Sequence, residues 1–154
     1  MIKILFCCHG NICRSPLAQS VFTHKVKSLG LADQFYINSM ATSTEEIGNP
    51  PHRGIVQKLR EAGIPLIAHR ATQISWSDYS EYDYIIGMDE RNVQNLHRML
   101  KNDPDRKIYK FLTFAGSDRD IADPWYTGNF DETYRDVLQG CEGLLNHLKN
   151  KIKR

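Results

Sequence analysis

The opening of the chain constrains the fold most, because an apolar strand leads directly into a turn-rich loop and a helix start. Residues 2–8 (IKILFCC) form a nearly continuous apolar run, which is typical of a strand buried on both faces. The following residues, HGNICRS, contain a glycine and an asparagine that favour a turn. Ser15 and Pro16 then predict a helix N-cap and a first helical residue, and Gly30 ends that helix.

Strands and helices alternate along the rest of the chain. The sequence predicts further strands at 34–42, 82–88 and 108–112, and helices at 52–62, after Asp89 and at 131–152. The expected core face of the last helix is Tyr134, Val137, Leu138, Cys141, Leu144, Leu145 and Leu148. Such alternation predicts one α/β domain, residues 1–154, with a doubly wound parallel sheet flanked by helices. Ligands bind beyond the carboxyl ends of such strands, which is where residues 8–15 follow the first strand.

Composition excludes several classes of protein. A net charge of +2 gives no electrostatic case for nucleic-acid binding, and the basic residues at 149–154 are expected to decorate a last helical turn. The first residues lack the regions of a signal peptide, and no apolar run is long enough to span a bilayer. Three of the 4 cysteines lie close together, a poor layout for a disulfide framework. We therefore expect reduced thiols in a cytoplasmic protein.

Cys8 and Arg14 frame the segment that carries the chemistry. Successive backbone N–H groups in a loop at a helix N-terminus form an anion-binding nest. Arg14 adds a planar fork that binds two oxygens of one phosphate, which lysine cannot do. The same positive field favours the thiolate form of Cys8 and makes it a standing nucleophile at neutral pH. Ser15 can donate a hydrogen bond to the sulfur, which would steady the thiolate and help it leave a thiophosphate.

Asp123 is the candidate proton donor. A thiolate expels a phenolate-type leaving group poorly unless an acid protonates that group, an effect of about 10² to 10⁴ in rate. Asp123 opens the sequence Asp-Pro-Trp-Tyr, and a carboxyl group beside a dianion and a thiolate is expected to stay protonated when substrate binds. Trp125 and Tyr126 are placed to flank a flat aryl group, although ordinary packing would also explain both aromatic residues.

Several segments resemble the low-molecular-weight protein-tyrosine phosphatases. Residues 2–22 are similar to the opening of that family and residues 122–126 (ADPWY) to its general-acid loop, while residues 46–51 (EIGNPP) and 88–90 also match. The resemblance covers nearly the whole chain in order. It implies a four-stranded parallel sheet, no metal or other cofactor, and hydrolysis of phosphotyrosine in proteins through an S-phosphocysteine intermediate. Phosphate, sulfate or vanadate would bind the same loop, in a protein expected to be a monomer without a membrane span.

The resemblance also implies a role for individual residues. It makes Cys8 the nucleophile, Arg14 the phosphate clamp and Asp123 the general acid, which later acts as the base that activates water. The rest of the phosphate-binding loop is then His9, Gly10, Asn11, Ile12, Cys13 and Ser15. A supporting hydrogen-bond shell is implied for Asn11, Ser39, His69 and Asp89. Cys13 resembles the family's second cysteine, which closes a reversible disulfide onto the nucleophile under oxidation.

The sequence departs from the family pattern beside the substrate slot. Glu45 stands where the family often has an aromatic residue, so we expect it to line the slot with Trp125 and Tyr126. Ile12 resembles the tyrosine-phosphatase branch, whereas the related protein-arginine phosphatases tend to have threonine there. A preference for substrates that are not acidic near the phosphotyrosine is expected from the carboxylates that should flank the mouth, namely Glu45, Glu46, Asp118, Asp120 and Asp131.

Simpler structural interpretations stay open for several residues. Cys8 alone would suit a buried strand position, and Asp123 alone would suit an Asp-Pro turn. His69 is as compatible with a structural role as with a catalytic one, and a helix cap adequately explains Asp89. Asn11 tolerates a left-handed backbone, which would itself serve the loop. His9 would equally pack or touch solvent, and core positions are expected for Cys7 and Cys141.

Three other functions compete with hydrolysis. A zinc site built from Cys7, Cys8, His9 and Cys13 is disfavoured, because adjacent cysteines project in different directions and Cys-x-x-Cys spacing is absent. A thiol-dependent arsenate reductase would share the fold and the loop, but its cysteine relay would have only Cys141 downstream. A module that docks phosphoproteins without turnover would not need the trio of Cys8, Arg14 and Asp123.

Overall fold

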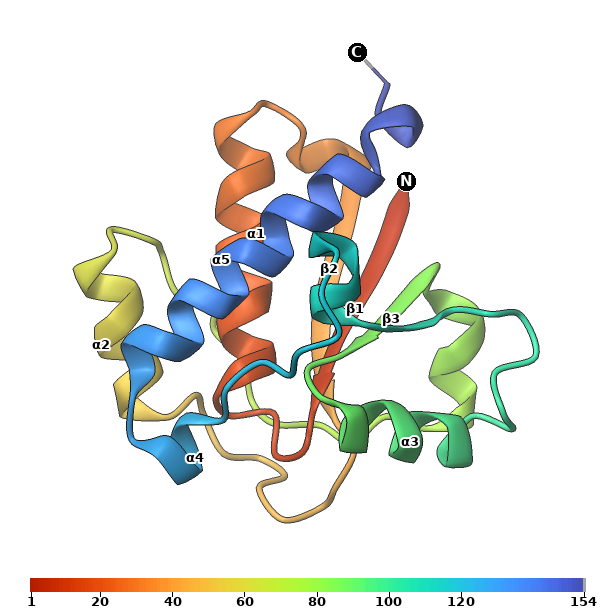
Figure 1. The fold of residues 1–154 in the computed structure, drawn as a ribbon, viewed down its shortest axis with the longest axis horizontal. Coiled ribbons are helices and arrows are strands. Elements are labelled where there is room, and N and C mark those ends of the chain that lie inside the picture. The colour runs from red at the N-terminus through yellow and green to blue at the C-terminus, as the bar shows by residue number, and fades with distance from the viewer. Residues whose placement is uncertain (154) are drawn as a thin grey trace.

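A parallel sheet of four strands organises the molecule (Figure 1). The computed structural model describes residues 1–153, and the strands are β1 (Ile2–Cys8), β2 (Phe35–Ala41), β3 (Tyr84–Gly87) and β4 (Ile108–Lys110). Their order across the sheet is β2-β1-β3-β4, and every neighbouring pair is parallel. The chain leaves β1 toward β2 on one side and returns to β3 on the other. The carboxyl end of β1 therefore lies at the switch point where such sheets bind ligands, and the predicted fold class is confirmed.

Helices and short 3₁₀ turns connect the strands. The helices are α1 (Arg14–Ser28), α2 (Arg53–Glu61), α3 (Glu90–Met99), α4 (Pro124–Thr127) and α5 (Phe130–His147). The 3₁₀ turns are Ala32–Gln34, Trp76–Glu81, Phe111–Ala115 and Lys149–Lys151. In Figure 1, α5 crosses α1 in front of the sheet, and α4 stands at the lower edge near the loop that leaves β1. Within residues 1–153, no helix combines the length and the apolar character needed to cross a bilayer.

The side chains of β1 alternate between two cores, as expected of a strand covered on both faces. Ile4, Phe6 and Cys8 belong to the larger core, which α1 and α5 complete. Leu5 and Cys7 belong to a smaller core on the other face, which is closed by Tyr79, Tyr82, Ile85, Leu96 and Leu100. Cys7 and Cys8 therefore point in opposite directions, and the core positions predicted for Cys7 and Cys141 are confirmed.

Two helices depart from the sequence prediction, one in its start and one in its core face. Helix α1 begins at Arg14 with Cys13 at the N-cap, so the prediction of Ser15 as the cap is wrong. The prediction of Leu138 as a core residue is also wrong, since it is 37% exposed on the solvent side of α5. The buried stripe of α5 and its C-cap consists of Val137, Cys141, Leu144 and Leu148, which recur at helical spacing. Leu138 follows Val137 directly and therefore lies outside this stripe.

The C-terminal elements are shorter than predicted. Strand β4 stops at Lys110, because the next residues turn into a 3₁₀ segment that buries Phe111 and Leu112 in the larger core. The final helix ends at His147 and is followed by the Lys149–Lys151 turn, where Lys151 Nζ donates to Tyr84 Oη at 2.8 Å. Arg154, the last residue of the expected basic end, lies outside the described residues. Helix α4, which was not predicted, places the residues after Asp123.

A left-handed turn after α3 depends on one buried carboxylate. Lys101, Asn102 and Asp103 all have positive φ angles of 53° to 61°, a conformation that costs about 1–2 kcal/mol for each non-glycine residue. The Asp103 carboxylate accepts hydrogen bonds from Tyr79 Oη and from the backbone N–H groups of Lys107 and Ile108. Burial alone would raise the pKa of Asp103, but these hydrogen bonds outweigh it and hold the pKa below its ordinary value.

Tyr79→Phe should therefore destabilise the protein by about 1–3 kcal/mol, because a buried carboxylate loses a donor. A lowered folded-state pKa stabilises the fold above about pH 4 and stops doing so as the pH falls through the folded-state value. The variant should consequently lose less stability than the parent between neutral and acid pH. Urea denaturation at several pH values measures both effects. Tyr126→Phe, at an 83% exposed tyrosine, is the control, and equal stability of the two variants would contradict the interpretation.

Candidate active site

Cys8 is the last residue of β1, and the whole residue is 3% exposed. The backbone N–H of Asn11 donates to Cys8 Sγ at 3.3 Å, and Ser15 Oγ lies 3.0 Å from the same sulfur. Asn11 adopts a left-handed conformation with φ 59°, as its residue type allows. This conformation folds the loop back so that its amide meets the sulfur. The loop and the first turn of α1 thus present a hydroxyl and an amide to one thiol.

The Asn11 side chain links the loop to three other segments. Its Nδ2 donates to Ser15 Oγ at 2.8 Å and to Ser39 Oγ at 3.0 Å, while its Oδ1 accepts from the backbone N–H of Thr72 at 3.2 Å. His69 Nε2 lies 2.6 Å from the same Oδ1. Burial lowers the pKa of His69, so a neutral imidazole carries its proton on Nε2 and donates to the amide oxygen. Of the predicted supporting shell of Asn11, Ser39, His69 and Asp89, the structure joins the first three in one hydrogen-bonded group, whereas Asp89 binds Arg14 instead.

The donors and acceptors of this group determine the direction of the bond to sulfur. Ser39 Oγ uses its only proton to donate to Gln19 Oε1 at 2.6 Å. It therefore acts as the acceptor in its hydrogen bond with Asn11 Nδ2. Ser15 Oγ likewise accepts from Asn11, which leaves its own hydroxyl proton for the Cys8 sulfur. A hydroxyl that donates to sulfur favours the thiolate over the thiol. Gln19 was not a predicted site residue, and no sequence signal distinguishes it from other residues of α1.

Arg14 is buried beneath the loop between two carboxylates. Its Nη1 donates to Asp89 Oδ2 at 2.8 Å and to the backbone carbonyl of Ile121 at 3.2 Å, and its Nη2 donates to Asp123 Oδ2 at 3.2 Å. Burial alone would lower the pKa of Arg14, but the negative charges of Cys8, Asp123 and Asp89 raise it above its ordinary value. The guanidinium is therefore a permanent, oriented cation next to the thiol.

Asp89 and Asp123 each cap a helix and bind Arg14 at the same time. Asp89 Oδ1 accepts from the N–H of Asn92 at 2.7 Å at the start of α3, and its Oδ2 faces Arg14. Asp123 Oδ1 accepts from the N–H of Trp125 at 3.0 Å at the start of α4, and its Oδ2 faces Arg14. The cap interpretation of Asp89 and the turn interpretation of Asp123 thus fit the structure, and neither prevents a second contact with Arg14. The catalytic role of Asp123 stays a prediction.

A pocket of about 630 Å³ collects most of the predicted site residues. Those that line it are Cys8, His9, Gly10, Asn11, Ile12, Cys13, Arg14, Glu45, Asp89, Asp123, Trp125 and Tyr126. Ser15, Ser39 and His69 do not line it and act through Asn11 and Cys8. Four lining residues were not predicted in the site itself: Glu46, Arg91, Asn92 and Asp120. The spacing Asp89-x-x-Asn92 is a capping signal that would have found Asn92, whereas no sequence signal marks Arg91.

Two pairs of residues form walls of the pocket: the aromatic residues Trp125 and Tyr126, and the contacting side chains of His9 and Glu45. Trp125 and Tyr126 are 64% and 83% exposed, so core packing does not explain them. On the other wall, His9 Nε2 lies 3.0 Å from Glu45 Oε2. His9 is therefore exposed to solvent, one of the two alternatives considered in sequence, with its side chain 48% accessible. Glu45 and His9 both line the pocket, and the role of Glu45 in a substrate slot stays a prediction.

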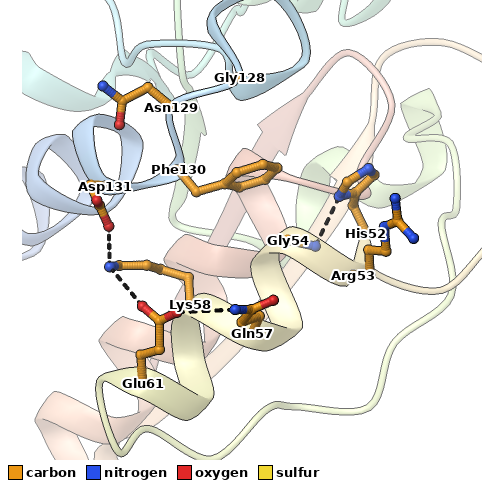
Figure 2. A pocket seen from close by; sticks show the side chains of 10 residues that line it. All are labelled: His52, Arg53, Gly54, Gln57, Lys58, Glu61, Gly128, Asn129, Phe130 and Asp131. Carbon is orange, nitrogen blue, oxygen red and sulfur yellow. Dashed lines mark hydrogen bonds and ion pairs between the residues drawn. The ribbon is translucent and has the colours of Figure 1, made fainter.

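A second cavity of about 510 Å³ lies between α2 and the start of α5 (Figure 2). Asp131 lines this cavity and forms an ion pair with Lys58, so the prediction that it flanks the mouth is wrong. Asp118 lines neither cavity, while Glu45, Glu46 and Asp120 do line the mouth. His52 lines the second cavity, and its ring stacks on Phe130 at 5.5 Å between centroids. The same ring lies edge-to-face with Trp125 at 6.4 Å, and Trp125 lines the first pocket.

The other cysteines are poorly suited to share the chemistry of Cys8. Burial, with the nearby Cys8 charge, raises the pKa of Cys13 to about 12, so its thiol stays protonated at neutral pH. Burial raises the pKa of Cys7 and of Cys141 as well. Cys7 also points to the opposite face of the sheet, which separates it from the remaining members of the zinc set considered in sequence. The redox pairing of Cys13 with Cys8 stays a prediction.

Comparison with known proteins identifies the family. The family model for low molecular weight phosphotyrosine protein phosphatases matches residues 3–154. The chain belongs to this family. A low molecular weight protein-tyrosine-phosphatase of Bacillus subtilis, YfkJ, is 39% identical over 153 residues, which is 98% of each chain. Its crystal structure superposes with a TM-score of 0.94 at 38% identity and covers 99% of this chain and 98% of its own.

Two further solved structures bear on the range of the family. The low molecular weight protein tyrosine phosphatase SP-PTP of Streptococcus pyogenes is 42% identical with a TM-score of 0.86, and the match covers 96% of this chain and 93% of that one. DARP, described as a drosophila arginine phosphatase, is 31% identical with a TM-score of 0.88, and the match covers 96% and 98%. The phosphatase fold is therefore shared by proteins named for two different phosphorylated residues.

Gly54→Ala should disturb the aromatic wall of this phosphatase-family pocket. A Cβ at residue 54 would lie 2.3 Å from Phe130 Cζ, and the ring cannot retreat without leaving His52 (Figure 2). We expect a loss of about 1–3 kcal/mol in stability from this overpacking. We also expect a raised KM for aryl phosphates, because His52 supports Trp125.

Thermal denaturation and steady-state kinetics measure the two effects of Gly54→Ala. Gln57→Ala, one turn further along α2 and exposed, is the matched control and should change stability by less than about 0.5 kcal/mol. A Gly54→Ala protein with the stability and KM of the parent would contradict the role given to the stacked rings.

Proposed function

We propose that this chain is a protein-tyrosine phosphatase that hydrolyses phosphotyrosine in proteins through an S-phosphocysteine intermediate on Cys8. One observation carries the proposal: Ser15 Oγ and the Asn11 amide lie 3.0 and 3.3 Å from a single sulfur, beside the buried guanidinium of Arg14. Together they stabilise a thiolate in a pocket whose remaining groups suit a phosphate monoester. Phosphoproteins are the proposed partners, and free phosphate, sulfate or vanadate are the proposed ligands of the same loop.

Arg14 has two N–H groups suited to the phosphate. Asp89 and Ile121 accept hydrogen bonds from Nη1, and Asp123 accepts one from Nη2. Within residues 1–153, no hydrogen bond involves Nε–H, and Nη2 has a second N–H, so we assign the phosphate to the edge formed by Nε and Nη2. That edge binds two oxygens of one phosphoryl group in parallel. Loop amides would bind the remaining oxygen charge.

The first chemical step transfers the phosphoryl group to sulfur. The Cys8 thiolate attacks phosphorus, an S–P bond forms, and the bond between phosphorus and the tyrosine oxygen breaks. Asp123 gives its proton to that departing oxygen, so tyrosine leaves as a neutral phenol. Arg14 and the loop amides stabilise the charge that spreads over the equatorial oxygens. Trp125 and Tyr126 hold the aryl ring beside Asp123.

The second step returns the enzyme to its starting state. Asp123, now a carboxylate, takes a proton from water while the water oxygen attacks phosphorus. The S–P bond breaks, inorganic phosphate forms, and sulfur recovers its negative charge. The Ser15 hydroxyl donates a hydrogen bond to the departing thiolate, which lowers the cost of its departure.

Alternative functions have less support. Arsenate reduction needs further reactive thiols, but Cys141 is fully buried in α5 and Cys7 faces the other core. A docking module without turnover would not need a proton donor at the position of Asp123, which shares Arg14 with the phosphate site. Ile12 lines the pocket, and isoleucine at this position resembles the tyrosine-phosphatase branch of the family. The cytoplasmic location and the monomeric state stay predictions from the sequence.

The proposed activity predicts hydrolysis of p-nitrophenyl phosphate and of phosphotyrosine peptides in the presence of EDTA. Vanadate should inhibit competitively, because it occupies the same loop as the phosphoryl group. Cys8→Ser should be inactive yet retain binding of a phosphotyrosine peptide, measured by calorimetry. Full turnover by Cys8→Ser, or faster hydrolysis of phosphoarginine than of phosphotyrosine by the parent, would reject the proposal.

Ser15→Ala should slow the second step more than the first, since Ser15 stabilises the departing thiolate. Loss of a hydrogen bond to a charged group corresponds to about 1.5–3 kcal/mol, or roughly 10- to 100-fold in kcat. Rapid mixing with p-nitrophenyl phosphate should then show a burst of about one equivalent of nitrophenol, because the phosphoenzyme accumulates. Asp123→Asn is the comparison, with a slowed first step for poor leaving groups. A Ser15→Ala enzyme with the parent's kcat and no burst would remove Ser15 from the mechanism.

A further inference from the structure

The carboxylates at the rim of the active-site pocket differ in whether a lysine or an arginine is paired with them. Asp89 and Asp123 are paired with Arg14, and Asp120 is paired with Lys110 at 2.8 Å. Glu46 Oε2 accepts only from the neutral amide of Asn49. Glu45 faces the His9 imidazole and has a side chain that is 69% exposed. Among the described lining residues, the carboxylates that no lysine or arginine balances are therefore Glu45 and Glu46.

The segment that carries Glu45 is attached to the phosphate-binding loop. The backbone N–H of Ser43 donates to the His9 carbonyl at 3.1 Å, and Ser43 Oγ donates to the same carbonyl at 2.8 Å. The N–H of Glu45 donates in turn to Ser43 Oγ at 3.4 Å. His9 Nε2 then meets the Glu45 carboxylate itself. Backbone and side-chain contacts to one residue thus hold the carboxylate at the pocket wall.

His9 and the phosphate-binding loop position the two carboxylates. His9 Nε2 lies 3.0 Å from Glu45 Oε2, and this contact holds Glu45 at the pocket wall. The stem of Glu46 packs beside Gly10, where a Cβ would come within 3.3 Å of Glu46 Cγ. Glu45, through His9, and the stem of Glu46 therefore lie against the phosphate-binding loop.

The sheet order places opposite charges on opposite sides of the slot. The loop with Glu45 follows β2, whereas Arg91 stands in the first turn of α3, which follows β3. Strand β1 and the phosphate-binding loop lie between them. Arg91 forms no ion pair within residues 1–153 and lines the same pocket. A peptide that inserts its phosphotyrosine thus has acidic groups on the β2 side and a cation on the β3 side.

We propose that Glu45 is a specificity-determining residue that selects phosphotyrosine sequences with a lysine or arginine next to the phosphotyrosine. The proposal rests on the phosphatase activity proposed above. A lysine or arginine next to the phosphotyrosine is attracted to the Glu45 carboxylate, which is exposed and has no lysine or arginine partner. An acidic residue at the same position is repelled by that carboxylate. Glu46 adds to the same field, and His9 is the positioning residue that keeps Glu45 at the wall.

The experiment compares three phosphotyrosine peptides that differ only in the residues next to the phosphotyrosine: lysine, glutamine or glutamate. The value of kcat/KM is measured for each at low ionic strength, where screening of the charges is weakest. The parent should prefer the lysine peptide over the glutamate peptide by about tenfold, in the range that exposed charge pairs support. Raising the salt to about 0.5 M should reduce this ratio, because the charges are then screened.

Variants assign the preference to Glu45. Glu45→Gln should reduce the lysine-to-glutamate ratio to about twofold, and Glu45→Lys should invert it. His9→Gln should also lower the ratio, because Glu45 loses its anchor. Glu142→Gln, an identical chemical change on the exposed side of α5 away from the pocket, is the control and should keep the parent ratio. An unchanged ratio in Glu45→Gln, or a parent ratio within twofold of one, would overturn the proposal.

The failure of this inference differs from the failure of the proposed function. If all three peptides are hydrolysed equally fast by the parent and not by Cys8→Ser, the phosphatase activity stands and the role of Glu45 is overturned. If the parent hydrolyses none of the peptides, both proposals are overturned. A preference that does not respond to salt would also overturn the role of Glu45, since it would come from shape and not from charge.

Discussion

A one-way series of hydrogen bonds beneath the sulfur is the constraint on which the site depends. Gln19 accepts from Ser39, Ser39 accepts from Asn11, and Asn11 also donates to Ser15. Each hydroxyl has a single proton, so these bonds leave the Ser15 proton for Cys8 and for no other partner. Residues from α1, β2 and the loop after β1 must all be in register for this to hold. The direction of the last bond is thus a property of the whole network and not of Ser15 alone.

Helix capping gives the charged groups of the site their positions. Asp89 and Asp123 each use one oxygen for a helix N-terminus and the other for Arg14. A carboxylate that is already held by a backbone N–H loses little further freedom when it orients a guanidinium. The position of Arg14 therefore depends on the fold, because the starts of α3 and α4 must be formed before both carboxylates can hold the guanidinium. Beyond these groups, the stacked rings of His52 and Phe130 support the wall at Trp125.

Local sequence predicted the parts of the site that depend on order along the chain. The apolar run of β1, the following loop and α1 lie within about 30 residues, and the structure places Cys8 and Arg14 where their spacing indicated. Ser15 shows the limit of such reasoning. Its type and the following proline suited an N-cap, yet its hydroxyl faces Cys8 because Asn11 and the sulfur compete successfully for it. Leu138 shows the same limit, because the packing of α5 on α1 and on the Phe111–Ala115 turn buries Val137 and leaves Leu138 exposed.

By itself, the sequence determined the alternation of strands and helices, the strand–loop–helix unit with Cys8 and Arg14, and the candidate acid at Asp123. These features follow from periodicity, turn chemistry and short-range spacing, which act between residues close in the chain. Only the tertiary structure decided that Asp131 belongs to a second cavity while Glu45 and Arg91 line opposite sides of the slot. The physical reason is that strand order, and not chain order, brings the loops after β2, β1 and β3 together.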